Sequence, residues 1–220
     1  MFRNRADAGI QLAAKLKGRA FDHPLVLAIP RGGIVTGYVL ASELHADLDV
    51  VLARKLRAPG QPELAIGAIA EDGKLYLNRF AQSFVERLDE YLPRERQHQL
   101  NEIARRQTLF RAARPAASIA GRSVIVTDDG IATGSTMIAA LQAVRVHKPR
   151  ELIVAVPVAS PERLAEVQRW CDEVVCLLSA EEFWAVGQFY RDFRQIEDEE
   201  VVETLRKFVP ALQEPAGAAL

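Results

Sequence analysis

Runs of consecutive apolar residues alternate along the chain with stretches in which apolar residues recur every three or four positions. Residues 25–29 and 49–53 form nearly continuous apolar runs, which are typical of strands buried on both faces of a parallel sheet. The same pattern predicts strands over residues 123–127, 152–156 and 173–178. Helical spacing predicts helices over about residues 5–18, 34–44, 136–147 and 161–170. This alternation indicates an α/β fold, in which helices flank a twisted parallel sheet.

The middle of the chain departs from this alternation. Pro59, Gly60 and Pro62 predict a loop over residues 56–65, and a hairpin follows between 66–70 and 74–77. Residues 80–113 show helical spacing, with a break expected near Pro93 and an apolar stripe made of Phe80, Phe84, Leu88 and Tyr91. We therefore expect a single domain over residues 1–220 that carries a helical insertion, or hood, at about 78–115. An aromatic C-terminal segment is expected at about 180–210, and the end of the chain from residue 213 onward is expected to fray.

Composition narrows the class of protein. The 220 residues are 49% hydrophobic and 26% charged, and the formal net charge is -1, so the chain as a whole is not expected to bind nucleic acid. Cys171 and Cys176 are too few for a disulfide framework and are expected to be reduced thiols. No apolar run approaches the ~20 residues of a membrane span, and no signal-peptide core is apparent. We expect a cytoplasmic protein.

The segment from Val124 to Thr136 carries the clearest chemistry. A buried strand is followed by two adjacent carboxylates, a loop with two glycines, and the start of a helix. The N–H groups and the positive dipole end at a helix start favour a phosphate dianion, and three hydroxyl groups can donate further hydrogen bonds. The carboxylates suit the vicinal hydroxyls of a ribose as acceptors. We interpret the segment as a site for ribose 5′-phosphate in preference to simple helix capping.

Competing motifs are excluded by inspection. Residues 32–37 have the glycine spacing of a Walker A motif, but Tyr38 stands where the lysine should be. No strand is followed by G-x-G-x-x-G, and neither C-x-x-C nor H-E-x-x-H occurs. Nucleophile-elbow hydrolase chemistry has no sequence support either.

Val124 to Thr136 resembles the signature of the type I phosphoribosyltransferases. The resemblance extends over roughly residues 20–180. It implies a transferase that binds phosphoribosyl pyrophosphate with Mg²⁺ and transfers the phosphoribosyl group to a nitrogenous base. It also implies that Asp128 and Asp129 contact the ribose hydroxyls and that the following loop cradles the 5′-phosphate. The residues expected to bind in this loop are Gly130, Ala132, Thr133, Gly134, Ser135 and Thr136. Magnesium is expected to be held mainly by substrate and water, with no protein ligand assigned.

Two further segments belong to this resemblance. Pro30 to Gly33 is similar to the pyrophosphate loop of the family, which makes Arg31, Gly32 and Gly33 candidate pyrophosphate ligands. Arg54 and Lys55 resemble the basic end of the second strand in adenine phosphoribosyltransferases. The loop over residues 56–65 corresponds to the mobile loop of the family. Since ligands bind beyond the carboxyl ends of parallel strands, we expect the three segments to lie along one rim. The catalytic candidates are Arg31, Lys55, Asp128 and Asp129.

The acceptor is not determined by the sequence. Residues 183–193 contain five aromatic residues and are similar to the segment that stacks on the base in hypoxanthine phosphoribosyltransferases. Phe183, Trp184 and Tyr190 are therefore candidate acceptor-binding residues, although packing against the core explains the segment equally well. Ala132 replaces the third acid of the hypoxanthine enzymes, and residues 152–160 lack their purine-reading lysine, which argues against a 6-oxopurine acceptor.

These residues leave three functions open. The first is a phosphoribosyltransferase of nucleotide metabolism, in the glycosyltransferase (pentosyltransferase) class. The second is a non-catalytic sensor of phosphoribosyl pyrophosphate or nucleotides with a regulatory output, whose RNA or protein surface would lie on arginines of the helical insertion and its end, namely Arg94, Arg96, Arg105, Arg106 and Arg114. A phosphoribosyl-handling hydrolase or a degenerate enzyme is a third alternative. The resemblance also implies a homodimer.

Overall fold

Five parallel strands form the core sheet of the computed structural model, which describes residues 1–77, 81 and 85–209 (only the backbone at 62–65 and 85–89). The strand order is β2-β1-β6-β7-β8, and every neighbouring pair is parallel. The strands are β1 (Leu25–Ala28), β2 (Asp47–Val50), β6 (Ser123–Thr127), β7 (Glu151–Ala159) and β8 (Glu173–Ser179). The α/β fold predicted from the alternating pattern is confirmed.

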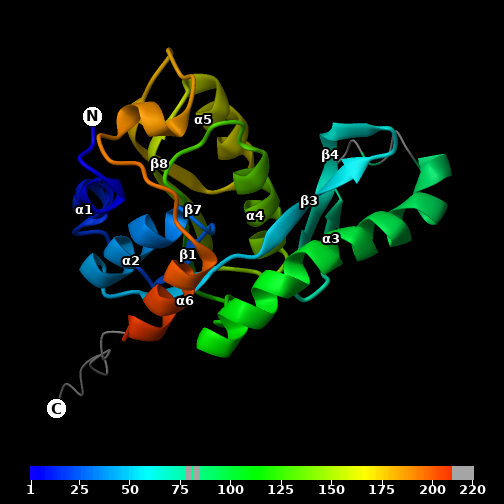
Figure 1. Ribbon diagram of the computed structural model, residues 1–220, viewed down its shortest axis with the longest axis horizontal. Coiled ribbons are helices and arrows are strands. Elements are labelled where there is room, and N and C mark those ends of the chain that lie inside the picture. Colours follow the sequence, from blue (N-terminus) through cyan, green and yellow to red (C-terminus); the bar gives the residue numbers. More distant parts are fainter. Residues whose placement is uncertain (78–80, 82–84, 210–220) are drawn as a thin grey trace.

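Helices cover both faces of this sheet (Figure 1). On one face lie α1 (Arg5–Leu16), α2 (Gly33–Glu43) and α6 (Asp198–Lys207), and on the other lie α4 (Ser135–Arg145) and α5 (Pro161–Val167). Side chains alternate between the faces along each strand. Val26 and Ile125 therefore pack with α1 and α2, whereas Leu25 and Val124 pack with α4. Among the described residues, the core also contains two short 3-10 helices, η2 (Gln168–Trp170) and η3 (Val186–Phe189).

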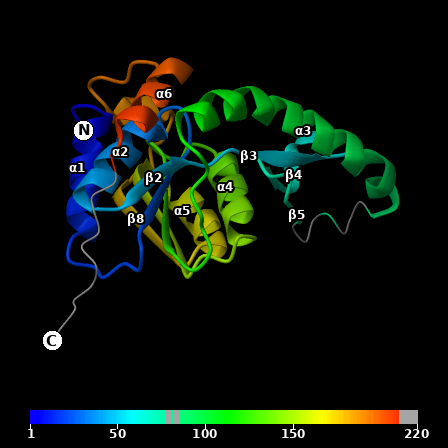
Figure 2. The same cartoon turned by 90° about the horizontal axis from the view of Figure 1, so that it is seen from below.

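A second, antiparallel sheet stands beside the core. It consists of β3 (Ala53–Ala58), β4 (Gln61–Ala70) and β5 (Leu75–Leu77), and the long helix α3 (Val85–Ala113) lies along it. We call these four elements the arm. Figure 2 shows the arm projecting sideways from the core, with α3 running back toward α6. Because α4 packs against β6 and also against β3 and β4, it stands between the two sheets.

The strand predicted over residues 49–53 has the wrong bounds. β2 ends at Val50, and the next strand, β3, begins at Ala53 in the other sheet. Arg54 and Lys55 therefore lie within β3 and not at the carboxyl end of a core strand. The apolar run continues where the chain leaves the core sheet, because both residues at this point are packed. Leu52 is buried in the cluster on the α1–α2 face of the sheet, and Ala53 packs against the cluster on the α4 face. No polar residue therefore marks the change from one sheet to the other.

The loop predicted over residues 56–65 is also wrong. β3 and β4 pair as an antiparallel hairpin, and only Pro59 and Gly60 form its turn. Gly60 adopts a φ of +73°, a left-handed conformation that glycine reaches without strain. Pro59 and Gly60 correctly predicted that the chain reverses its direction here. Composition does not show, however, that cross-strand hydrogen bonds extend both strands up to this turn. The hairpin predicted between 66–70 and 74–77 is confirmed as β4 and β5.

Helix α3 passes through Pro93 without ending, so the predicted break is wrong. A proline removes one helical hydrogen bond, but neighbouring side chains are held by tertiary contacts. Leu92 packs against the core cluster, and the buried carboxylate of Glu95 binds Arg57 of β3 at 2.9 Å. Of the predicted apolar stripe on this helix, Phe80, Phe84 and the side chain of Leu88 lie outside the described residues.

Arg111 ties the arm to the core. Its guanidinium lies 2.6 Å from Asp49 of β2 and 2.5 Å from Glu71 in the β4–β5 turn, and it also donates to the carbonyl of Val50 at 3.2 Å. The Asp49 side chain is almost fully buried. Because one guanidinium bridges α3, β2 and the hairpin, the position of the arm is set by contacts of the core.

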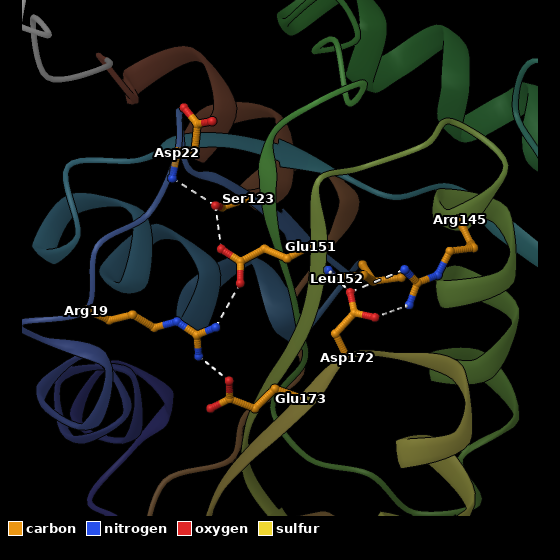
Figure 3. A network of polar contacts seen from close by, with 8 residues as sticks. All are labelled: Arg19, Asp22, Ser123, Arg145, Glu151, Leu152, Asp172 and Glu173. Carbon is orange, nitrogen blue, oxygen red and sulfur yellow. Dashed lines mark hydrogen bonds and ion pairs between the residues drawn. The ribbon is translucent and has the colours of Figure 1, made fainter.

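The amino-terminal edge of the core sheet is closed by a polar network (Figure 3). Arg19, which follows α1, binds Glu151 of β7 at 2.8 Å and also binds Glu173 of β8. Ser123 of β6 donates to Glu151 at 2.6 Å and accepts from the backbone N–H of Asp22. Three strands are thereby joined at the edge opposite to the loops that follow β1 and β6, and those loops remain available for a ligand.

Both cysteines are free thiols, as predicted. Cys171 is buried, and burial raises the pKa of its thiol to about 11, so it stays protonated at neutral pH. In the part of the chain that the structure describes, no helix combines the length and the apolar character needed to cross a membrane.

Candidate functional site

The loop after β6 leads directly into α4. Gly134 takes a φ of +78° immediately before the helix, and no side chain caps the helix start. The backbone N–H groups of the first turn therefore face the loop without a side-chain acceptor, which is the arrangement that favours an anion. Thr133 and Thr136 are exposed and Ser135 is half-buried, so their hydroxyls can reach a ligand placed there.

The loop after β1 lies against the two acids of this segment. A Cβ added at Gly32 would lie 1.9 Å from Oδ2 of Asp129, and one added at Gly33 would lie 3.0 Å from Cα of Asp128. Any larger residue at Gly32 would displace the Asp129 carboxylate. The peptide bond between Pro30 and Arg31 is cis. The structure thus brings the predicted pyrophosphate loop and the predicted ribose acids into direct contact.

A cleft of about 680 Å³ opens between the core and the arm. Its lining combines Pro30 of the loop after β1, Arg54 and Lys55 of β3, and the hydroxyl residues that begin α4, which are Thr133, Ser135 and Thr136. Residues from three distant parts of the sequence therefore converge on one space. Arg31, Asp128 and Asp129 do not line this cleft. Arg31 follows Pro30, which does, and the two acids contact the loop after β1.

Helix α3 supplies the wall of the cleft opposite to α4. Its lining residues are Gln99, Glu102, Ile103, Arg105 and Arg106. Gln99, Glu102 and Ile103 were not predicted from the sequence as site residues. The signal that could have indicated them is their spacing, because positions three and four apart lie on one helix face. The opposite wall of the cleft is thus provided by α3 of the arm and not by the core.

Carboxylates hold several of the cations around this cleft. Arg31 binds Glu197 at 2.8 Å, and Arg105 binds Asp198 at 2.6 Å, while Nε of Arg106 lies 3.6 Å from the same carboxylate. Arg114 donates to the carbonyl of Phe208. Three of the arginines suggested for a regulatory partner, Arg105, Arg106 and Arg114, thus have partners within the protein.

The paired acids lie in a poorly hydrated position. Burial, and then the charge of Asp129, raise the pKa of Asp128 well above its usual range, although the N–H groups of Asp129 and Gly33 oppose the change. Burial also raises the pKa of Asp129, and the hydrogen bond from Arg5 opposes this. Two adjacent carboxylates of this kind favour a ligand that donates hydrogen bonds, such as a diol, over another anion.

Arg5 is a functional candidate that the sequence analysis missed. Its Nε lies 2.7 Å from Oδ2 of Asp129, and its side chain is 9% exposed. A signal was present in the pattern, because Arg5 precedes Ala8, Gly9 and Leu12 on the buried face of the first helix. A charged residue on an apolar face needs a buried partner, and only the folded structure identifies that partner as Asp129.

The aromatic segment packs near these acids. The Tyr190 hydroxyl donates to the backbone carbonyl of Asp129 at 2.6 Å, its side chain is buried, and burial raises its pKa. The rings of Phe183 and Phe189 lie 5.1 Å apart. Trp184 is 89% exposed. The structure thus places Tyr190 behind Asp129 and leaves Trp184 in solvent.

The chain is similar to known proteins over most of its length. The model of the phosphoribosyl transferase domain family matches residues 2–194. Two strains of Mycobacterium tuberculosis have a relative named "Putative phosphoribosyl transferase" that is 42% identical over 205 residues, covering 93% of this chain and 46% of the relative. The chain thus spans about half the length of these curated relatives. The crystal structure of TT1426 from Thermus thermophilus is 43% identical, covers 93% of this chain and 97% of that one, and has a TM-score of 0.89. Together with the Val124–Thr136 signature and its place at the carboxyl edge of the sheet, these matches show that the chain belongs to the phosphoribosyl transferase domain family, in the type I superfamily.

Proposed function

We propose that this protein is a magnesium-dependent phosphoribosyltransferase that uses phosphoribosyl pyrophosphate and a nitrogenous base. The observation that carries the proposal is the convergence of three segments. The loop before α4, the loop after β1 and the basic pair of β3 meet around one cleft, and the loop after β1 touches the two acids. A phosphate cradle, hydroxyl acceptors and cations are the groups that this substrate requires.

Each group has a distinct task in this proposal. The N–H groups and hydroxyls at the start of α4 bind the 5′-phosphate, and Asp128 and Asp129 accept hydrogen bonds from the ribose hydroxyls. Lys55 and the backbone of Gly32 and Gly33 meet the charge that develops on the pyrophosphate as its bond to the anomeric carbon breaks. A base nitrogen forms the new bond to that carbon.

Magnesium fits the chemistry of these donors. Carboxylate oxygens are the hard ligands that Mg²⁺ prefers, and the ion keeps several waters. Oδ2 of Asp129 is already bound by Arg5, and Oδ1 of Asp128 accepts the N–H of Asp129 at 2.8 Å, so the ion would be held mainly by oxygens of the substrate. When bound, it would neutralise charge on the leaving pyrophosphate.

A thermal-shift titration with phosphoribosyl pyrophosphate, with and without Mg²⁺, tests the proposal. Binding to the folded state alone stabilises it by about 2.7 kcal/mol when the ligand is at a hundredfold excess over its Kd. We expect a magnesium-dependent rise in Tm for the wild type and a smaller one for Lys55→Ala. Glu203→Gln, an exposed change on α6, serves as the control and should behave as the wild type.

A panel of bases then separates the alternatives. Pyrophosphate release that requires one of the bases supports the transferase. Release without any base would indicate a phosphoribosyl-handling hydrolase instead. Binding without turnover on any base would favour the sensor. No shift at millimolar ligand would refute the proposed binding site.

A further inference from the structure

A buried arginine from the first helix reaches the candidate ribose site. Arg5 begins α1 and lies 124 positions before Asp129, yet its Nε donates to Oδ2 of that residue at 2.7 Å. The Arg5 side chain is 9% exposed and that of Asp129 is 13% exposed. Water therefore screens this ion pair far less than it screens a surface pair, and breaking it leaves a buried charge without a partner.

The Arg5 guanidinium is held in one orientation by two further contacts. Nη1 donates to the carbonyl of Arg194 at 2.8 Å, and Cζ lies 3.8 Å from the centre of the Phe193 ring, which is the geometry of a cation–π contact. A planar fork fixed on one side by a carbonyl and on one face by an aromatic ring presents its Nε in a defined direction. That direction is occupied by the Asp129 carboxylate.

The backbone around these residues is also fixed. The N–H of Phe2 donates to the carbonyl of Phe189 at 2.8 Å, and the N–H of Arg191 donates to the carbonyl of Phe2 at 2.9 Å. The backbone just before α1 is thereby paired with the aromatic segment. Since Tyr190 in the same segment binds the backbone carbonyl of Asp129, both ends of the matched domain converge on one acid of the site.

The neighbours of Asp129 constrain the orientation of its carboxylate. Its Oδ2 lies against the backbone of Gly32, and the neighbouring Asp128 adds a second carboxylate that repels it when both are ionised. Arg5 provides a cation that stabilises a carboxylate in this place. Neither Arg5 nor Asp129 lines the cleft, and the Arg5 side chain is the more buried of the two, at 9% against 13% exposed.

We propose, resting on the proposed function, that Arg5 is a positioning residue for the ribose subsite. It holds the Asp129 carboxylate in the orientation that accepts a hydrogen bond from a ribose hydroxyl, without touching the substrate itself. The aromatic segment supports this role from behind through Phe193 and the Arg194 carbonyl. This gives the segment a task in ribose binding whether or not it also contacts the acceptor.

Calorimetric titration of the full chain with phosphoribosyl pyrophosphate and Mg²⁺ tests this role. Arg5→Gln should weaken binding at least about tenfold, because an orienting charge-assisted hydrogen bond is lost. Arg5→Lys keeps the charge but replaces the rigid planar fork with a mobile ammonium, so its affinity should lie between those of the wild type and Arg5→Gln. Arg3→Gln is the matched control, since the Arg3 side chain is 74% exposed and pairs with Asp7, and its affinity should equal that of the wild type.

A double-mutant cycle shows whether the effect passes through Asp129. When Asp129→Asn is already present, Arg5→Gln should change the affinity by less than about twofold further. Thermal unfolding of each variant without ligand separates a loss of stability from a loss of positioning. If the wild type binds, and Arg5→Gln has a lower Tm but the same affinity, the positioning role alone is overturned. Tighter binding by the Arg5 variants would do the same, whereas a wild type that does not bind would overturn both proposals.

Discussion

Replacing Glu95 with glutamine should lower the free energy of unfolding by about 3 kcal/mol at pH 7. The Glu95 side chain is 4% exposed. It accepts the backbone N–H of Arg57 at 3.0 Å, two guanidinium bonds at 2.9 and 3.0 Å, and the amide of Gln99 at 2.9 Å. Burial works against ionisation, but the bonds from Arg57 outweigh it and lower the pKa of Glu95 from 4.5 to about 2. A change of this size corresponds to about 3 kcal/mol of stability.

The pH dependence of this contribution has a definite sign. Because the pKa of Glu95 is lower in the folded state than in the unfolded chain, its contribution is fully present above about pH 4.5 and is lost as the pH falls toward 2. The difference in stability between the wild type and Glu95→Gln should therefore be constant from pH 7 to about pH 5 and should narrow below that.

Urea unfolding followed by circular dichroism at several pH values between 7 and 4 measures this difference. Glu102→Gln on the same helix is the control, because the Glu102 side chain is 53% exposed and lies 3.9 Å from Arg54. Its effect should stay below about 1 kcal/mol, as for other exposed pairs. If Glu95→Gln matched this control at pH 7, or if its deficit in stability grew as the pH fell, the Glu95–Arg57 pair would not hold α3 to β3.

Two further substitutions test packing and the site. Phe110→Ala should cost about 3–5 kcal/mol in chemical denaturation, because this ring on α3 is fully buried, and a loss below about 1 kcal/mol would mean that the cavity collapses without cost. Gly32→Ala should weaken binding of phosphoribosyl pyrophosphate at least about tenfold in calorimetry, because its Cβ would lie 1.9 Å from Oδ2 of Asp129. Wild-type affinity in that variant would contradict the close contact between the two loops.

The core could be predicted from the sequence because its signals are local. Strands β1, β6 and β7 are apolar runs between helices with three-and-four spacing, and their burial on both faces follows from the residues themselves. The same pattern located β8, although this edge strand is only half-buried. The Val124–Thr136 segment is equally local. Its strand, its acids and its hydroxyls are adjacent in sequence, and the start of α4 lies where the pattern predicts it, within one residue.

The arm and the surroundings of the acids depended on the tertiary structure. Apolar residues run without interruption from Val50 through Ala53, so the change of sheet within that run is decided by pairing with β4 and not by composition. Arg5 and Asp129 are 124 positions apart, and a side-chain pattern states that a buried charge needs a partner without stating which. The tertiary structure decides both the sheet that β3 joins and the partner of Arg5. Ion pairs and sheet pairing depend on distances in space, whereas hydrophobic periodicity depends on distances along the chain.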